Sequence, residues 1–279
     1  MTSSAPLTLD DIRSTLATVQ FGQRLYVHHE VPSTNSEAMA LAQAGAEHGT
    51  VVVAESQSAG RGRLSRQWHS PAGANLYCSV IVKDEGRTVG DSEWLSWMPL
   101  ASALAAAEAV QVTTSIPLSV KWPNDLLYQD RKVGGILCES LRTPIQGSIV
   151  VIGIGLNVNL PQKSFPEELR QTATSLFEIS KNSIDRNRLL AQLLYELEQV
   201  VRELTIHGSS HLRPAYLNRC CTIGKRVRVI LRAEQEIIGT AESISSDGAL
   251  QVRPHFTAPT GSPHELIDVH AADIVHLRE

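Results

Sequence analysis

Cysteine is scarce in this chain of 279 residues, and the four that occur show no pairing pattern. Cys78 and Cys138 lie within apolar runs, where a free cysteine usually packs as a small hydrophobe. Cys220 and Cys221 are adjacent and lack the spacing and flanking histidines of a zinc site. Because unpaired thiols are typical of a reducing compartment, the sequence predicts a cytoplasmic protein. The ten histidines form no ligand pattern either, so no metal site built by the protein itself is expected.

An excess of positive charge is also missing, since 25 Lys and Arg stand against 29 Asp and Glu, a net charge of -4. Nucleic-acid-binding domains usually carry a basic footprint, so no nucleic-acid partner is expected. The chain has no run of about 18 apolar residues, and its first residues lack the basic and apolar regions of a signal peptide. No membrane association is therefore expected. Aromatic residues make up only 5%, yet 42% hydrophobic and 19% charged residues fit a globular protein with an ample core.

Apolar periodicity predicts strands alternating with helices over most of the chain. Strands are expected at residues 24–31, 50–57, 75–83, 119–121, 132–139 and 148–159, and helices at 8–19, 33–45, 185–207 and 212–217. In the helix at 185–207, Asp185 is the expected cap and Gly208 the expected stop. A further Ala-rich helix should end near Gln111 and hold Pro99 in its first turn, which leaves Glu93 to Met98 outside it. Five short strands follow residue 221 and predict a small barrel. A boundary near Arg219 then divides the chain into domains 1–218 and 219–279.

An Arg- and Gly-rich segment between two apolar runs is the most distinctive stretch. It contains Gly60-Arg61-Gly62-Arg63, followed by Trp68. Glycine lets the backbone approach a ligand closely, and the guanidinium fork fits phosphate or carboxylate. A solvated hairpin loop with cations for solubility is the alternative. The Trp, Pro and Gly that follow favour a loop that orders against a bound anion.

Three further polar or glycine-rich motifs stand at the ends of expected strands or within them. Ser33 and Thr34 open a helix, where they can cap it or bind a polar ligand beside its free N–H groups. Asn124-Asp125 follows Trp-Pro and is either a simple turn or part of a polar site with Lys121. Gly153 and Gly155 share one face of a strand, which leaves room for a flat ligand or marks a bulge or tight packing.

Six short motifs follow one another along the chain. They are Ser33-Thr34-Asn35; Gln57 with Gly60-Arg61-Gly62-Arg63; Trp68, Ser70-Pro71 and Gly73-Ala74-Asn75-Leu76; Lys121-Trp122-Pro123-Asn124-Asp125; Lys132-Val133-Gly134-Gly135-Ile136-Leu137; and Gly153-Ile154-Gly155-Leu156-Asn157. Taken together and in chain order, they resemble the motifs of biotin–protein ligases. The resemblance covers roughly residues 22–279, including the small C-terminal barrel, and six motifs in the family's order make it specific. It implies an α+β fold with a mixed or antiparallel central sheet flanked by helices, like that of class II aminoacyl-tRNA synthetases, plus an SH3-like β-barrel.

The resemblance implies an enzyme that uses ATP to join biotin to a lysine of a biotin carrier domain, in acetyl-CoA carboxylase or a similar enzyme. Biotinyl-5′-AMP is the intermediate, and Mg²⁺ is expected to bind through the nucleotide. The first step brings a carboxylate and a triphosphate together against their repulsion. Arg61, Arg63 and Lys132 are the cations available for this. Each charge-assisted hydrogen bond contributes about 1.5–3 kcal/mol.

The resemblance also implies roles for single residues. Ser33, Thr34 and Gln57 would bind the ureido ring of biotin, and Asn35 and Trp68 are further residues expected to bind a substrate. The remaining roles concern the biotin tail, the phosphates and the nucleotide. The backbone from Gly60 through Gly62 to Arg63 would wrap the tail and acyl phosphate, and Lys132 would contact the carboxylate or the acyl-phosphate oxygen. Space for the bicyclic ring or the tail would be left by Gly134, Gly153 and Gly155. Asn124 would lie near the adenine, Asn157 near the phosphates or the metal, and Asp125 would orient the incoming lysine.

Two other functions remain open at this point. Lipoate–protein ligases and octanoyltransferases share the catalytic fold, although Gly-Arg-Gly-Arg with Lys-Trp-Pro-Asn-Asp favours biotin. A catalytically silent biotin-binding module is disfavoured by the presence of all three cations. Many bacterial relatives carry a DNA-binding domain that represses transcription, but fewer than about 25 residues precede the first strand, so a monofunctional form is expected. Family members dimerise through a sheet edge, which makes a homodimer a further expectation.

Overall fold

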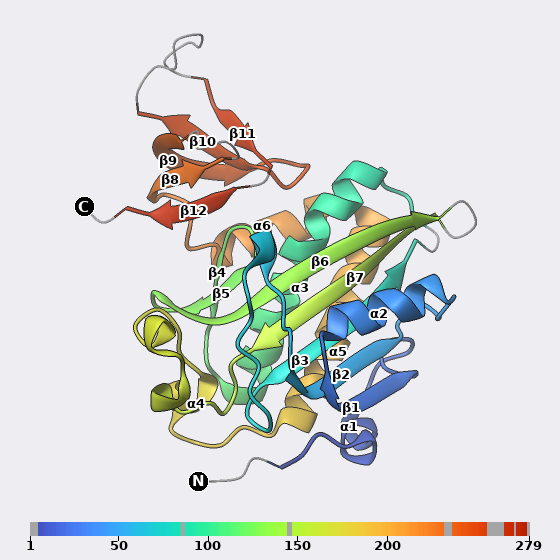
Figure 1. Cartoon of the computed structure of the whole chain (residues 1–279). Coiled ribbons are helices and arrows are strands. Elements are labelled where there is room, and N and C mark those ends of the chain that lie inside the picture. Colours follow the sequence, from blue (N-terminus) through green and yellow to red (C-terminus); the bar gives the residue numbers. More distant parts are fainter. Residues whose placement is uncertain are drawn as a thin grey trace.

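A seven-stranded mixed sheet lies at the centre of the larger part of the chain (Figure 1). The computed structural model describes residues 5–84, 87–143, 147–231, 236–255, 265–270 and 272–277. Among the described strands, β1 and β2 pair in parallel, and the other neighbours in this sheet pair antiparallel. In spatial order the strands are β1 Leu25–Val31, β2 Val51–Gln57, β3 Leu76–Lys83, β7 Gly147–Leu156, β6 Arg131–Thr143, β5 Asp125–Tyr128 and β4 Ser119–Lys121.

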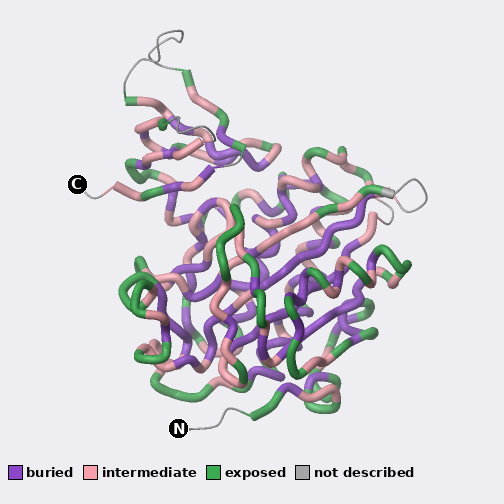
Figure 2. The backbone as a smooth tube through the Cα atoms, in the orientation of Figure 1, coloured by how far each residue is buried: buried purple, intermediate pink, exposed green. Residues whose placement is uncertain are grey.

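The central strands are buried on both faces, because helices cover each side. Figure 2 shows β3 and β7 as almost continuously buried segments. Alternation along the strands sends Val52 and Ile81 toward α2 (Thr34–Gln43), where they pack with Ala38 and Ala42. Their neighbours in sequence face α3 (Asp91–Thr114) and α5 (Arg186–His207), which pack against each other. Shorter helices complete this part: α1 Leu9–Thr15, η1 Arg63–Ser65, η2 Gln162–Ser164, η3 Glu167–Leu169, α4 Leu176–Ser180 and α6 Ser209–Arg219.

The helix α3 differs from the prediction. It begins at Asp91 and runs through Pro99 without a break, so Glu93 to Met98 belong to it. Trp94, Trp97 and Met98 are fully buried in these first turns. Burial of three large side chains outweighs the hydrogen bond that proline removes from the helix.

The helix α5 has the predicted ends. The Asp185 side chain caps it by accepting hydrogen bonds from the N–H groups of Asn187 and Arg188, at 2.9 and 3.2 Å. Gly208 follows its last residue with a φ of 72°, a conformation that glycine adopts at no steric cost. A new helix, α6, starts directly afterwards and is longer than the predicted turn at 212–217. Among the helices in the described ranges, none combines the length and hydropathy needed to span a bilayer.

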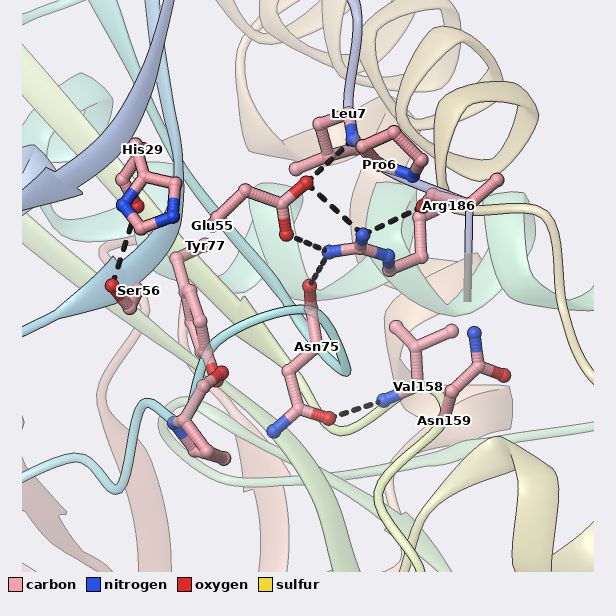
Figure 3. A network of polar contacts seen from close by, with 12 residues as sticks. Pro6, Leu7, His29, Glu55, Ser56, Asn75, Tyr77, Val158, Asn159 and Arg186 are labelled. Carbon is pink, nitrogen blue, oxygen red and sulfur yellow. Dashed lines mark hydrogen bonds and ion pairs between the residues drawn. The ribbon is translucent and has the colours of Figure 1, made fainter. Parts of the chain in front are cut away.

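A buried ion pair ties four separate segments together (Figure 3). Arg186, the first residue of α5, has a fully buried side chain that pairs with Glu55 of β2 at 2.7 Å. Its guanidinium also donates to the carbonyl oxygens of Ala5 and Asn75, at 2.7 and 3.1 Å. Burial opposes ionisation of Glu55, but hydrogen bonds from Arg186 and the Leu7 N–H hold its pKa below the ordinary value. The N-terminal segment, β2, the start of β3 and α5 are thus fixed by one guanidinium.

The last part of the chain forms a second, five-stranded antiparallel sheet. Its packing against the rest includes hydrogen bonds from two buried indoles. Trp97 Nε1 donates to Ser246 O at 2.7 Å, and Trp122 Nε1 donates to Gly248 O at 3.1 Å. The α+β class is confirmed, and so are the five short strands after residue 221. In spatial order they are β11 Ile267–Val269, β10 Leu250–Pro254, β9 Glu236–Ile244, β8 Arg226–Ile230 and β12 Asp273–His276.

Candidate active site

A cavity of about 1060 Å³ lies where the Arg-rich loop after β2, the β4–β5 turn, strands β6 and β7, and the C-terminal strand β12 meet. Its wall contains both charged and apolar side chains. Fourteen of the sixteen predicted site residues line it, although they come from six separate motifs. These are Ser33, Thr34, Asn35, Gln57, Arg61, Gly62, Arg63, Trp68, Asn124, Asp125, Lys132, Gly153, Gly155 and Asn157.

The other two predicted residues, Gly60 and Gly134, serve the packing behind the wall. A Cβ atom on Gly60 would come within 2.6 Å of Ser70 Oγ and of the Trp68 carbonyl oxygen. A Cβ atom on Gly134 would meet Leu156 Cδ2 at 2.6 Å and the Gly155 carbonyl oxygen at 2.8 Å. Both glycines therefore let two backbone segments approach each other.

The three predicted cations all face this cavity, but each already has a protein partner. Lys132 Nζ lies 2.5 Å from Asp125 Oδ1 and 5.3 Å from the centroid of the Trp68 ring. Arg61 pairs with both carboxylate oxygens of Glu139, at 2.9 and 2.6 Å. These partners keep the cations in place and can be exchanged for ligand oxygens, because all four side chains of the two ion pairs remain partly exposed.

The third cation, Arg63, joins the loop to the β4–β5 turn and to the C-terminal sheet. Its guanidinium donates to Asn124 Oδ1 at 3.2 Å and to the Ala272 carbonyl oxygen at 3.4 Å. Burial lowers the pKa of Arg63, while the nearby carboxylates of Asp273 and Asp125 oppose that shift. Arg66 of the same loop forms an ion pair with Asp273 at the start of β12. The loop therefore lies between the two sheets.

A second, uncharged group of side chains gathers at the N-terminus of α2. The Gln57 amide oxygen accepts from the Thr34 N–H at 2.9 Å and from the Thr34 hydroxyl at 3.2 Å. Gln57 Nε2 donates to Ser70 Oγ at 2.9 Å. Ser33 is the residue before the helix, yet its side chain makes no capping hydrogen bond, so its hydroxyl is available to a ligand in the cavity it lines. This subsite offers neutral donors and acceptors fixed by short bonds.

The two glycines of β7 make room for protein side chains in this structure. A Cβ atom on Gly153 would overlap the Asn35 amide, and one on Gly155 would lie 2.6 Å from the Trp68 ring. Trp68 Nε1 is buried and has no hydrogen-bond partner among the described residues. The Trp68 indole thus lies against β7 in the cavity wall and has an unused donor.

Sequence reasoning missed three polar residues at this site. Glu139 holds both Arg61 and the Asn35 amide, the latter at 2.8 Å. Ser79 is fully buried on β3, and its hydroxyl lies 2.8 Å from Thr34 Oγ1. His276 lines the cavity from β12; burial, together with the charges of Lys121 and Lys225, lowers its pKa to about 4. A single polar residue within an apolar strand was the available signal for Ser79 and Glu139, whereas nothing local distinguishes His276.

The chain also resembles known proteins in sequence and in fold. Residues 28–159 match the Biotin/lipoate A/B protein ligase family, and residues 222–277 match the Biotin protein ligase C terminal domain. The chain is 36% identical over 278 residues to the biotin–[acetyl-CoA-carboxylase] ligase of Mycobacterium tuberculosis, covering 98% of this chain and 97% of that one. It is 33% identical over 244 residues to the bifunctional ligase/repressor BirA of Bacillus subtilis, covering 88% and 74%.

Two solved structures resemble the whole fold. Biotin protein ligase from Aquifex aeolicus in complex with biotin and ATP has a TM-score of 0.74 and 27% identity, covering 92% of this chain and 100% of that one. Biotin protein ligase from Leishmania major in complex with biotinyl-5-AMP has a TM-score of 0.60 and 26% identity, covering 89% and 99%. The family models match both the larger part and the C-terminal part of this chain, and its identity to a relative is 36% along nearly the full length of both. These findings show that this chain belongs to the biotin protein ligase family.

Proposed function

We propose that this chain activates biotin with ATP and transfers it to a lysine of a carrier protein. The biotin carboxylate attacks the α-phosphate of ATP, which gives biotinyl-5′-AMP and releases pyrophosphate. A lysine amine then attacks the carbonyl carbon of the mixed anhydride, which forms the amide, loses a proton and releases AMP. The chain is thus a ligase that makes a carbon–nitrogen bond. The observation that carries the proposal is one cavity in which the three predicted cations, Arg61, Arg63 and Lys132, lie beside a fixed neutral subsite.

The neutral subsite is proposed to bind the ureido ring of biotin. A cyclic urea offers two N–H donors and one carbonyl acceptor, and the Thr34 and Ser33 hydroxyls and the Gln57 amide can complement both kinds. Asn35 and the Trp68 indole border the same space. Because the Thr34 and Gln57 side chains are already held by hydrogen bonds, little freedom is lost when the ring binds.

The cations are proposed to bring the carboxylate and the phosphates together. Lys132 would exchange Asp125 for the reacting oxygens, and Arg61 would exchange Glu139 for phosphate oxygens. The released Asp125 carboxylate would then be free to orient the incoming lysine amine. Positioning and stabilisation of the charge that builds on the α-phosphate supply the rate gain, since the protein contributes no covalent step.

The nucleotide end of the cavity is proposed to lie at the β4–β5 turn. Asn124 would contact the adenine, and Asn157 would approach the phosphates. Mg²⁺ would be held mainly by phosphate oxygens, with the Asn157 amide oxygen as the protein group suited to it. Among the described residues, the one cluster of His, Cys, Asp or Glu dense enough to hold a cation lies outside this cavity.

Several broader features belong to the same proposal. The acceptor is a biotin carrier domain of acetyl-CoA carboxylase or a similar enzyme, since two relatives are named for that reaction. The reaction takes place in the cytoplasm and involves neither nucleic acid nor membrane. Residues 1–218 would form the catalytic domain and 219–279 the C-terminal domain; the interval between α6, which ends at Arg219, and β8, which begins at Arg226, supports a boundary in this region. A homodimer would form through a free sheet edge such as β1.

The test is substrate-dependent exchange of labelled pyrophosphate into ATP, followed by transfer to a purified carrier domain. Biotin should support exchange and transfer, whereas lipoate and octanoate should support neither. Lys132→Met should slow adenylation about 100-fold, while Lys181→Met, which removes an exposed lysine from an ion pair on α4, should not. Exchange with lipoate in place of biotin, or biotin binding without pyrophosphate release, would overturn the proposal.

A further inference from the structure

Three potential metal ligands gather at the junction between α5 and α6, away from the cavity. Glu203 and His207 lie one turn apart on α5, and His211 follows on α6. Each offers one ligand atom, a carboxylate oxygen or an imidazole nitrogen, and these atoms all lie within 4.8 Å of one another. We propose that Glu203, His207 and His211 bind a divalent cation of the Zn²⁺ type.

The turn at Gly208 creates this cluster. Its left-handed φ of 72° ends α5 and starts α6 at the next residue. A Cβ atom there would lie 2.9 Å from Glu93 Oε1, the atom that accepts the Ser209 N–H at 2.7 Å. Glycine is therefore required both by the backbone conformation and by the close approach of α3. The turn holds the His211 ring over the His207 ring, with centroids 4.6 Å apart and planes 15° from parallel.

The ligand atoms are already close to the spacing that a tetrahedral ion needs. Bonds of about 2.0–2.1 Å from zinc to nitrogen or oxygen place neighbouring ligand atoms about 3.3 Å apart. His211 Nδ1 lies 3.5 Å from Glu203 Oε2. Rotation of the His207 imidazole would bring the third ligand atom to the same spacing. This rotation is sterically possible because His207 and His211 are exposed and Glu203 is partly exposed.

The chemistry of the three ligands selects the class of ion. Imidazole nitrogen suits Zn²⁺, Ni²⁺ and Cu²⁺, whereas Mg²⁺ and Ca²⁺ prefer sites built from oxygen alone. Two imidazoles and one carboxylate leave the fourth tetrahedral position to water, which this exposed site can supply. The histidines were expected from the sequence to form no ligand pattern. His207 and His211 are four residues apart, but they lie on two different helices, α5 and α6. They are therefore not the pair of ligands one turn apart on a single helix that a sequence pattern would reveal.

A bound ion would stiffen the connection to the C-terminal sheet. Helix α6 begins beside the site and contacts the second sheet through two side chains. Ser209 Oγ donates to Ser246 O at 2.9 Å, and Arg213 Nε donates to Ile244 O at 2.6 Å. An ion joining the last turn of α5 to the first turn of α6 therefore stabilises the segment that holds the two sheets together.

The experiment is calorimetric titration of the full chain with ZnCl₂ after chelator treatment and dialysis. We expect one Zn²⁺ per chain and an unfolding temperature that rises with Zn²⁺ concentration, because an ion that binds the folded state stabilises it. His207→Ala and His211→Ala should each weaken binding at least about tenfold, since loss of a mere outer-shell partner already costs 10–100-fold. The exposed His29→Ala on β1 is the matched control and should bind like the original chain.

Two measurements keep the result interpretable. Biotin-dependent pyrophosphate exchange should be unchanged in both histidine variants, since neither residue lines the cavity, and this shows that the variants fold. Co²⁺ in place of Zn²⁺ should give visible absorption without the near-ultraviolet band of a thiolate ligand. The proposal is overturned by a thiolate band, by one-to-one binding that survives the His207→Ala/His211→Ala double substitution, or by no binding at all.

Discussion

The absence of a side chain at Gly155 decides where the Trp68 ring can lie. We predict that Gly155→Ala displaces the indole, because the new methyl would lie 2.6 Å from the ring, closer than any ordinary contact. The affinity for biotin should fall about tenfold or more, which corresponds to a loss of about 1.4 kcal/mol in binding free energy. Calorimetric titration with biotin measures this. Gly90→Ala is the control, because a Cβ there meets nothing within 4 Å and its backbone is not left-handed; equal losses in both variants would contradict the prediction.

His276 should make stability depend on pH below neutrality. Burial and the charges of Lys121 and Lys225 lower its pKa to about 4 in the folded chain, against an ordinary value near 6.5 when unfolded. Between these values the unfolded chain binds a proton that the folded chain does not, so the free energy of unfolding falls as the pH falls from about 6.5 to 4.

We predict that His276→Gln flattens the pH dependence of the free energy of unfolding over this window. Urea unfolding at several pH values between 4 and 7 measures it. The exposed His29→Gln should keep the original slope, which controls for the loss of a histidine as such. An unchanged slope in His276→Gln would contradict a pKa of this ring that is lowered by burial and by the two lysines.

At the level of single residues, fourteen of the sixteen predicted site residues line the cavity, although they are a minority of the residues in its wall. Gly-Arg-Gly-Arg, Trp-Pro-Asn-Asp and the glycines of β7 carry recognisable chemistry, so their residues could be chosen before any coordinates. Glu139 and Ser79 could not be chosen in this way. Their contacts arise because the register of β3, β7 and β6 aligns Ser79 with Gly153 and Gly153 with Leu137, and a register is not encoded in any one strand.

At the level of elements, the buried pair of Arg186 and Glu55 fixes the start of α5 to β2. We predict that Arg186→Met lowers the free energy of unfolding by about 3–5 kcal/mol, because the Glu55 carboxylate, whose side chain is only 12% exposed, is left without its counter-ion. Urea unfolding at pH 7 measures the change. Arg24→Met removes an arginine from an exposed pair with Glu47 and should have little effect. Similar losses in the two variants would mean that burial of the Arg186 pair contributes nothing.

Elements were predictable where capping residues and periodicity agree. Asp185 and Gly208 mark both ends of α5, and its leucine stripe repeats at helical spacing, so the prediction was right to the residue. The start of α3 was wrong because Pro99 was given more weight than the apolar residues before it. Helix propensity can be judged from the residues of one helix alone. The burial of Trp94 and Trp97, in contrast, depends on the elements against which α3 packs, and the local sequence does not contain that information.

At the level of the whole molecule, two indoles couple the sheets, and one of them offers a test. We predict that Trp122→Phe loosens the C-terminal sheet selectively, because it leaves the Gly248 carbonyl oxygen without its donor, a loss of about 1–3 kcal/mol. Hydrogen exchange measured by mass spectrometry should become faster in β9 and β10 than in β3 and β7. Trp94→Phe is the matched control, since Trp94 Nε1 bonds to Thr205 Oγ1 within the larger part. Equal acceleration of both sheets in Trp122→Phe would contradict the prediction.

The wall of the cavity includes residues from Ser33 to Leu277, so one side of it is closed by β12, which is far along the chain from the motifs that line the rest. A polypeptide in which the seven-stranded sheet has formed but β12 has not docked lacks the Ala272–Leu277 border and the Asp273 partner of Arg66. Its pocket would be open to water on that side, and a reactive anhydride made there would be exposed to hydrolysis. Protection of the intermediate therefore depends on the docking of the second sheet as well as on the folding of the first.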